Sequence, residues 1–119
     1  MAKYERHLTG NFDDFLQTLD TGIMTGSVTA SYQDGSDFSS GDVRCAVRVY
    51  ERYSMIGGNR LSANITLVGN GDRLFLSVIA AGGSQAMFFK INTWGEESFV
   101  DKIARIVEAY ANGEVIKYV

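Results

Sequence analysis

The stretch "RLSANITLVGNGDRLFLSVIAA", residues 60–81, decides the fold of this chain. Its first half alternates apolar and polar residues, which is typical of a strand with one buried face. The Gly-Asn-Gly-Asp sequence at 69–72 predicts a tight turn. Residues 73–81 are apolar on both faces, so we expect them inside the sheet or under a helix. The residues expected to point inward from the first half are Leu61, Ala63, Ile65 and Leu67.

The period of two continues on both sides of this hairpin. We expect strands at 3–10, 27–34 and 42–54, and a further one at 85–91. Asp34-Gly35 predicts a turn, and 36–42 reads as a polar loop. The strand at 42–54 has two different sides. One side carries Val43, Cys45, Val47, Val49 and, at its end, Tyr53, and the other carries Arg44, Ala46, Arg48, Tyr50 and Arg52.

Two segments have the helical period instead. Residues 11–26 and 92–113 each place apolar residues three and four apart on one face. Asn11 is a natural N-cap, and acidic residues in the first turn favour the positive end of the helix dipole. The apolar stripes are Phe12, Phe15, Leu16, Leu19 and Ile23 in the first segment and Phe99, Val100, Ile103, Ile106, Val107 and Tyr110 in the second.

The predicted fold is α+β, in the order β-α-β-β-β-β-β-α. It has two layers, an antiparallel curved sheet of about five to six strands with two helices on one face. By analogy of topology it is helix-grip-like, a type in which a ligand often lies between sheet and C-terminal helix. Residues 1–119 are expected to form one α+β domain, and the tail 113–119 either adds an edge strand or frays.

Composition excludes several classes of protein. The net charge of −3 argues against a nucleic-acid partner, which requires a basic surface. No apolar run has the length of a membrane span, and the N-terminus lacks the apolar region of a signal peptide, so we expect a cytoplasmic protein. Cys45 is the only cysteine and His7 the only histidine, which excludes an internal disulfide and a Cys/His zinc site. We expect Cys45 to be a buried core thiol and predict neither a cofactor nor a metal.

The arginine row of the 42–54 strand is the first candidate site. Arg44, Arg48 and Arg52 project from one face with Tyr50 between them. Arginine binds carboxylates and phosphates through two parallel hydrogen bonds, so this face could bind an anionic ligand or an acidic partner. The alternative is a solvated outer face whose arginines pair with acids on neighbouring strands.

Gly82, Gly83, Ser84 and Gln85 form the second candidate ligand site. The stretch has neither a phosphate-loop nor a nucleophile-elbow pattern, and we expect a strand rather than a helix after it. The alternative is a bulge or sharp bend of the sheet, with at least one of the two glycines at positive φ.

Acidic residues offer weaker candidates. Glu5 lies on the same face as His7, so a histidine–carboxylate pair is geometrically feasible. Asp34, Asp37 and Asp42 are close in sequence, but their spacing does not match a calcium-binding EF-hand loop.

Several long stretches also carry a resemblance. "HLTGNFDDFLQTLDTGI", "GSVTASYQDGSDF", "GDVRCAVRVYERYSMIGGNR" and "AAGGSQAMFFKINTWGEE" resemble a domain-of-unknown-function family of small uncharacterised bacterial proteins (family 6054). The resemblance covers roughly 3–110 and leaves out the final "EVIKYV". It implies a bacterial protein and carries no activity, cofactor or site residue.

Two hypotheses of function follow. The first is a non-enzymatic domain that binds a small or anionic ligand or a protein partner, with homodimerisation through a strand face or edge as one form of it. The second is a small hydrolase or lyase that uses His7 with a nearby acid or Ser84.

Overall fold

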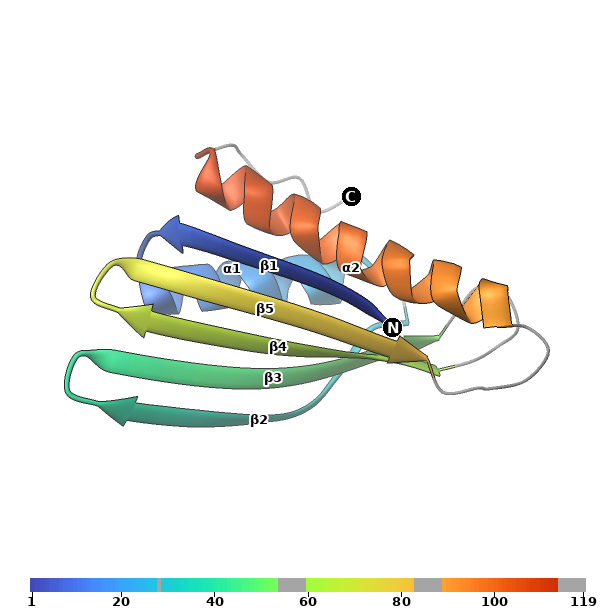
Figure 1. Cartoon of the computed structure of the whole chain (residues 1–119), viewed down its shortest axis with the longest axis horizontal. Coiled ribbons are helices and arrows are strands. Elements are labelled where there is room, and N and C mark those ends of the chain that lie inside the picture. The colour runs from blue at the N-terminus through green and yellow to red at the C-terminus, as the bar shows by residue number, and fades with distance from the viewer. Residues whose placement is uncertain (28, 54–59, 83–88, 114–119) are drawn as a thin grey trace.

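The computed structural model describes residues 1–27, 29–53, 60–82 and 89–113. Its strands form one antiparallel five-stranded sheet in the order β1-β5-β4-β3-β2 (Figure 1). The α+β class is therefore confirmed, and the strand number agrees with the expected five to six; the helix-grip analogy remains a prediction. In chain order the elements are β1 (Ala2–Thr9), α1 (Phe12–Thr25), β2 (Ser31–Ser40), β3 (Val43–Tyr53), β4 (Arg60–Asn70), β5 (Arg73–Gly82) and α2 (Phe89–Ala111).

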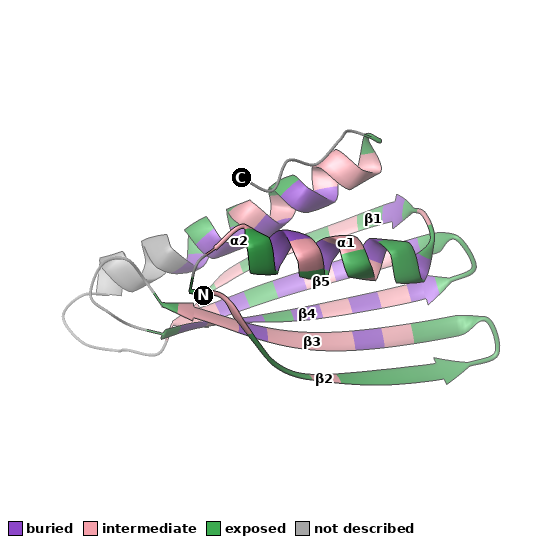
Figure 2. Cartoon of the chain, turned by 180° about the vertical axis from the view of Figure 1, so that it is seen from behind, coloured by how far each residue is buried: buried purple, intermediate pink, exposed green. Residues whose placement is uncertain are grey.

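Both helices lie on the same face of the sheet. In Figure 1 α1 runs behind the strands, and the reverse view in Figure 2 shows it in front of them with α2 beside it. The inward side of β4 is buried beneath these helices, as its alternation predicts, and β5 lies inside the sheet with its inward side buried, as its apolar sequence predicts. The opposite face of the sheet has no helix over it in the described part of the chain, so the molecule has two layers with one open side.

The sequence of α1 explains where it begins and ends. Asn11 has extended backbone, and its side-chain oxygen accepts a hydrogen bond from the Asp14 N–H at 2.9 Å. This confirms the predicted N-cap, a contact whose loss typically costs about 1 kcal/mol. At the other end the Gly26 N–H donates to the Gly22 carbonyl at 2.9 Å.

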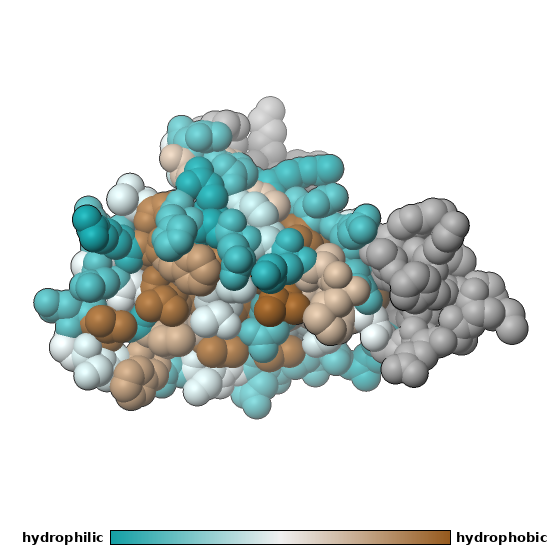
Figure 3. Space-filling view, in the orientation of Figure 1, coloured by the Kyte–Doolittle hydropathy of each residue, from teal (hydrophilic) through white to brown (hydrophobic). Residues whose placement is uncertain are grey.

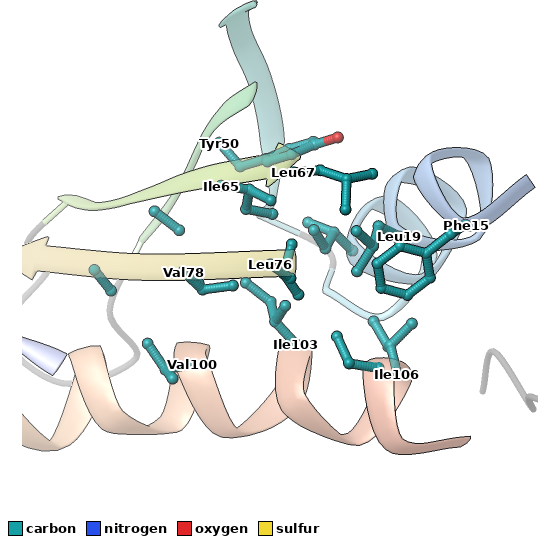
Figure 4. Packing of buried hydrophobic residues seen from close by; sticks show 14 of the residues in the cluster. Phe15, Leu19, Tyr50, Ile65, Leu67, Leu76, Val78, Val100, Ile103 and Ile106 are labelled. Carbon is teal, nitrogen blue, oxygen red and sulfur yellow. The ribbon is translucent and has the colours of Figure 1, made fainter. Parts of the chain in front are cut away.

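One apolar core joins the two layers. Phe15 and Leu19 of α1 face Ile65 and Leu67 of β4, and β5 packs against α2 (Figure 4). The apolar stripes predicted for the two helices are confirmed as buried, apart from the half-buried Leu16 and Tyr110. The most enclosed side chains are Phe15, Leu19, Tyr50, Leu61, Ile65, Leu67, Leu76, Val78, Phe99, Ile103 and Val107.

The β2 segment differs from the prediction. The expected loop at 36–42 is strand through Ser40, and the turn is at Gly41, whose φ is 58°, rather than at Asp34-Gly35. Polar residues are acceptable here because β2 is an edge strand, held by its pairing with β3. The register shifts between Tyr32 and Asp34, which marks an irregularity in this pairing.

The start of α2 also differs. The predicted strand at 85–91 is wrong for 89–91, which are the first residues of the helix, while 85–88 lie outside the described residues. A short apolar run fits the strand and helix periods equally well, so periodicity could not decide between them. The tail 114–119 is likewise outside the described residues. None of the described helices is long and apolar enough to cross a membrane.

Candidate functional site

The arginine row of β3 lies on the face that the helices cover. Ala46 and Tyr50, which share this side with the arginines, are each only 1% exposed. The side with Val43, Cys45, Val47 and Val49 therefore faces away from the helices. The expectation of a buried core thiol is wrong, because Cys45 is half-buried on the open side. Arginines are accommodated inside because their long stems pack against apolar atoms while the charged ends reach the margin.

Arg44 connects β3 to the start of α1. Its guanidinium lies 4.2 Å from the centre of the Phe12 ring and donates two hydrogen bonds of 2.9 Å to the Asp13 carboxylate. The hydrogen bonds from Arg44 hold the pKa of Asp13 below its ordinary value. This two-pronged contact is the kind that an external anion would make, and here a residue of the chain itself supplies the carboxylate.

Tyr50 and Arg48 make the contacts in the middle of the row. The buried Tyr50 hydroxyl donates to Asp20 of α1 at 2.6 Å, and burial, with this hydrogen bond second, raises the pKa of Tyr50. Arg48 donates to the Asp37 carboxylate of β2 and to the backbone carbonyl of Val47, both at 2.9 Å. The row therefore contacts α1 and the edge strand rather than one shared point.

Arg52 lies at the α2 end of the row. Its guanidinium lies 4.5 Å from the centre of the Phe99 ring, and burial lowers its pKa. It also lines an open surface pocket of about 360 Å³ that contains charges of both signs. The other residues of this pocket are Glu97, Ser98, Asp101, Lys102 and Arg105. An anion site over Arg44, Arg48, Tyr50 and Arg52 stays a prediction, and the contacts above give the first three a structural role.

Substitution of Arg48 separates these roles. If Arg48 serves mainly to hold β2, then Arg48→Gln should lower the free energy of unfolding by about 1–2 kcal/mol, because Asp37 loses a charged donor. A role in ligand binding alone leaves stability unchanged. Urea denaturation measures the difference, with Arg105→Gln as the control, since Arg105 is an exposed arginine on α2. Equal stability of the two variants would contradict the structural role.

The glycine-rich candidate is described only at its first residue. Gly82 pairs with Leu61 in the regular β4–β5 register and has no positive φ, so neither a bulge nor a bend occurs there. Its N–H donates to the buried carboxylate of Glu96 at 2.7 Å, which attaches the end of β5 to α2. Gly83, Ser84 and Gln85 lie outside the described residues, so their role as ligand residues stays a prediction.

The described contacts do not bring His7 and the aspartates of β2 together in one site. His7 is exposed, and its ring centre lies 4.8 Å from that of Phe75. Asp34 and Asp37 extend from opposite sides of β2, since Asp34 pairs with Val49 and Asp37 with Ala46. Within the described residues no group of three acidic, histidine or cysteine side chains is placed to hold a metal ion.

The open face of the sheet is the feature that stands out. One row near the β2–β3 and β4–β5 turns crosses all five strands in register, from Phe38 through Cys45, Val68 and Phe75 to His7. A second line of apolar residues runs along β3 and crosses this row at Cys45. Phe38 is 66% exposed, Ile79 40% and Val43 39%. Figure 3 shows the face, with apolar groups gathered among small polar ones. We call this surface the open face; its apolar members are Phe38, Val43, Cys45, Val47, Val49, Val68, Phe75 and Ile79.

The sequence contains two opposing signals for this surface. A solvent-facing side of an antiparallel sheet normally carries polar residues, so the pattern of β3 alone predicts that its valine side faces the core. The neighbouring strands gave the opposite indication: Phe38 is the register partner of Cys45, and it stands in an otherwise polar segment. A large aromatic residue in a polar edge strand is therefore the local sign of an apolar outer face.

Comparison with known proteins places the chain in a family. No curated protein and no solved structure matches it. A family model does match, over residues 1–111, which is nearly the whole chain and includes every described helix and strand. The chain therefore belongs to the family of unknown function DUF6054.

Proposed function

We propose that this protein is a non-enzymatic binding domain that binds a protein partner on the open face. The observation that carries the proposal is the apolar row from Phe38 through Cys45 and Val68 to Phe75. No helix covers this row in the described part of the chain. Contiguous exposed apolar residues are characteristic of interaction sites.

The dimensions of the face favour a protein over a small molecule. Five strands spaced about 4.8 Å apart, with about nine residues each at about 3.3 Å, give a face of about 700 Å². A typical protein interface buries about 800 Å² on each partner. Small ligands instead bind in concave pockets that enclose most of their surface, and a sheet face offers no such enclosure.

The residues of the anion and enzyme hypotheses give less support. Arg44 and Arg48 already donate to Asp13 and Asp37. The His7 ring packs against the apolar ring of Phe75. A catalytic base must lie within hydrogen-bond reach of the proton that it removes, and this ring contact gives no support for such a role.

Site-specific photo-crosslinking tests the proposal. Benzoylphenylalanine is placed at Asn64, an exposed residue of the open face, or at Gln17, an exposed residue of α1, in cells that express the protein. We expect a protein adduct from position 64 and none from position 17. Val47→Glu should remove the adduct, because a carboxylate in the apolar patch must lose its water on binding. If position 64 gives no adduct, or if Val47→Glu leaves it unchanged, the proposal is wrong.

A further inference from the structure

We infer that the partner on the open face is a second copy of this chain, packed sheet against sheet around a two-fold axis that runs along β4. The inference rests on the proposed function and adds to it the identity and orientation of the partner. It is carried by the charges of the open face, by the register of its rows and by its area.

The charges on the open face balance. Three basic and three acidic residues extend from this side, whereas the whole chain carries a net charge of −3. A strongly acidic or strongly basic partner would gain nothing from such a surface, but a second copy meets it without net repulsion. The six charged residues are Lys3, Glu5, Asp34, Glu51, Arg60 and Arg73.

The register places one pair of opposite charges, Lys3 and Asp34, at matching positions, while Arg60 lies on the axis, where its ion pair with Glu51 balances its charge. β4 is the central strand, so a two-fold axis along it sets β1 of one copy over β2 of the other. Lys3 and Asp34 lie at the two ends of one row, which runs through Val49, Asn64 and Ile79. Rotation about β4 brings Lys3 of each copy to the level of Asp34 of the other. The existing pair between Lys3 and Glu5, at 3.9 Å and exposed, is too weak to hold Lys3 elsewhere.

The same rotation matches the apolar residues. β5 comes to lie over β3 of the other copy, so that Phe75 meets Cys45 and Ile79 meets Val49. Val68 lies on the axis and meets its own copy. Sheets that pack face to face keep their strands within about 30° of each other, which such an axis allows.

The edges of the sheet suit a second copy less well. β2 has an irregular register near Gln33 and carries two aspartates, and β1 carries charges of both signs along its length. Bulges and charged side chains are the features that prevent edge strands from pairing with other chains. The buried area also favours the face over an edge. Two faces of about 700 Å² together bury an area within the range of stable interfaces.

Reversal of the two charges tests the inference. Sedimentation equilibrium of the purified full chain should give twice the monomer mass of 13.1 kDa. Lys3→Asp and Asp34→Lys should each weaken the dimer about tenfold, because both symmetric pairs change from attraction to repulsion. The double variant Lys3→Asp with Asp34→Lys should restore the original dissociation constant. Arg105→Asp, on the helix side, serves as the control and should leave the dimer unchanged; circular dichroism verifies that each variant is folded.

The outcomes separate this inference from the proposed function. A monomer at all concentrations, together with a crosslink from position 64 to a different protein, overturns the second copy and retains the binding face. A monomer without any such crosslink overturns both. A dimer that is insensitive to Val47→Glu, or that the double variant does not restore, overturns the arrangement around β4.

Discussion

Phe15→Ala is expected to lower the free energy of unfolding by about 3–5 kcal/mol, which is a large part of the stability of a domain of this size. Phe15 is fully buried, and its ring centre lies 4.8 Å from that of Tyr110. Truncation removes apolar area from the junction of α1, α2 and the sheet and leaves a cavity there. The surrounding strands are held in register by their ladders, so they cannot move in to fill it.

Urea denaturation at one fixed protein concentration measures this loss, since self-association would otherwise alter the apparent stability. Met24→Ala on the same helix is the matched control, because Met24 is partly exposed at 37% and should cost under about 0.5 kcal/mol. Similar losses for the two variants would show that α1 does not pack on the sheet as described.

Strands β4 and β5 show how far the sequence could predict the fold. Leu61 and Ile65 alternate with small polar residues, and a glycine turn fixes the hairpin, so local patterns were sufficient. The same holds for α1, where a cap, a charged first turn and an apolar stripe agree. In these segments each local preference points to the same structure.

The two sides of β3 show where prediction had to fail. Valine favours strands whether or not it is buried, and arginine can bury its stem, so the composition of either side fits either face. Only the position of the helices decides which side of β3 is buried. Tyr50 donates to Asp20 and Arg44 to Asp13, and both aspartates belong to α1, about thirty residues earlier in the chain. The open face could not be predicted for the same reason, since it is defined by what does not pack on it in the described part of the chain.

Gly22→Ala is expected to destabilise the protein by up to about 2 kcal/mol, although this change normally favours a helix by about 1 kcal/mol. Gly22 is buried where α1 meets α2. A Cβ atom added there would lie 2.6 Å from Cδ1 and 3.0 Å from Cγ1 of Ile106. Such overpacking of a well-filled interior typically costs about 1–3 kcal/mol and outweighs the gain in helix propensity.

A double-mutant cycle identifies the contact responsible. Ile106→Val removes Cδ1, the atom nearest to the added methyl group, so Gly22→Ala should cost about 1 kcal/mol less in that background than in the natural sequence. Gln17→Ala, at an exposed site on the same helix, should change stability by less than about 0.5 kcal/mol. If Gly22→Ala instead stabilises the protein, or if its effect adds independently to that of Ile106→Val, the two helices do not approach each other at Gly22.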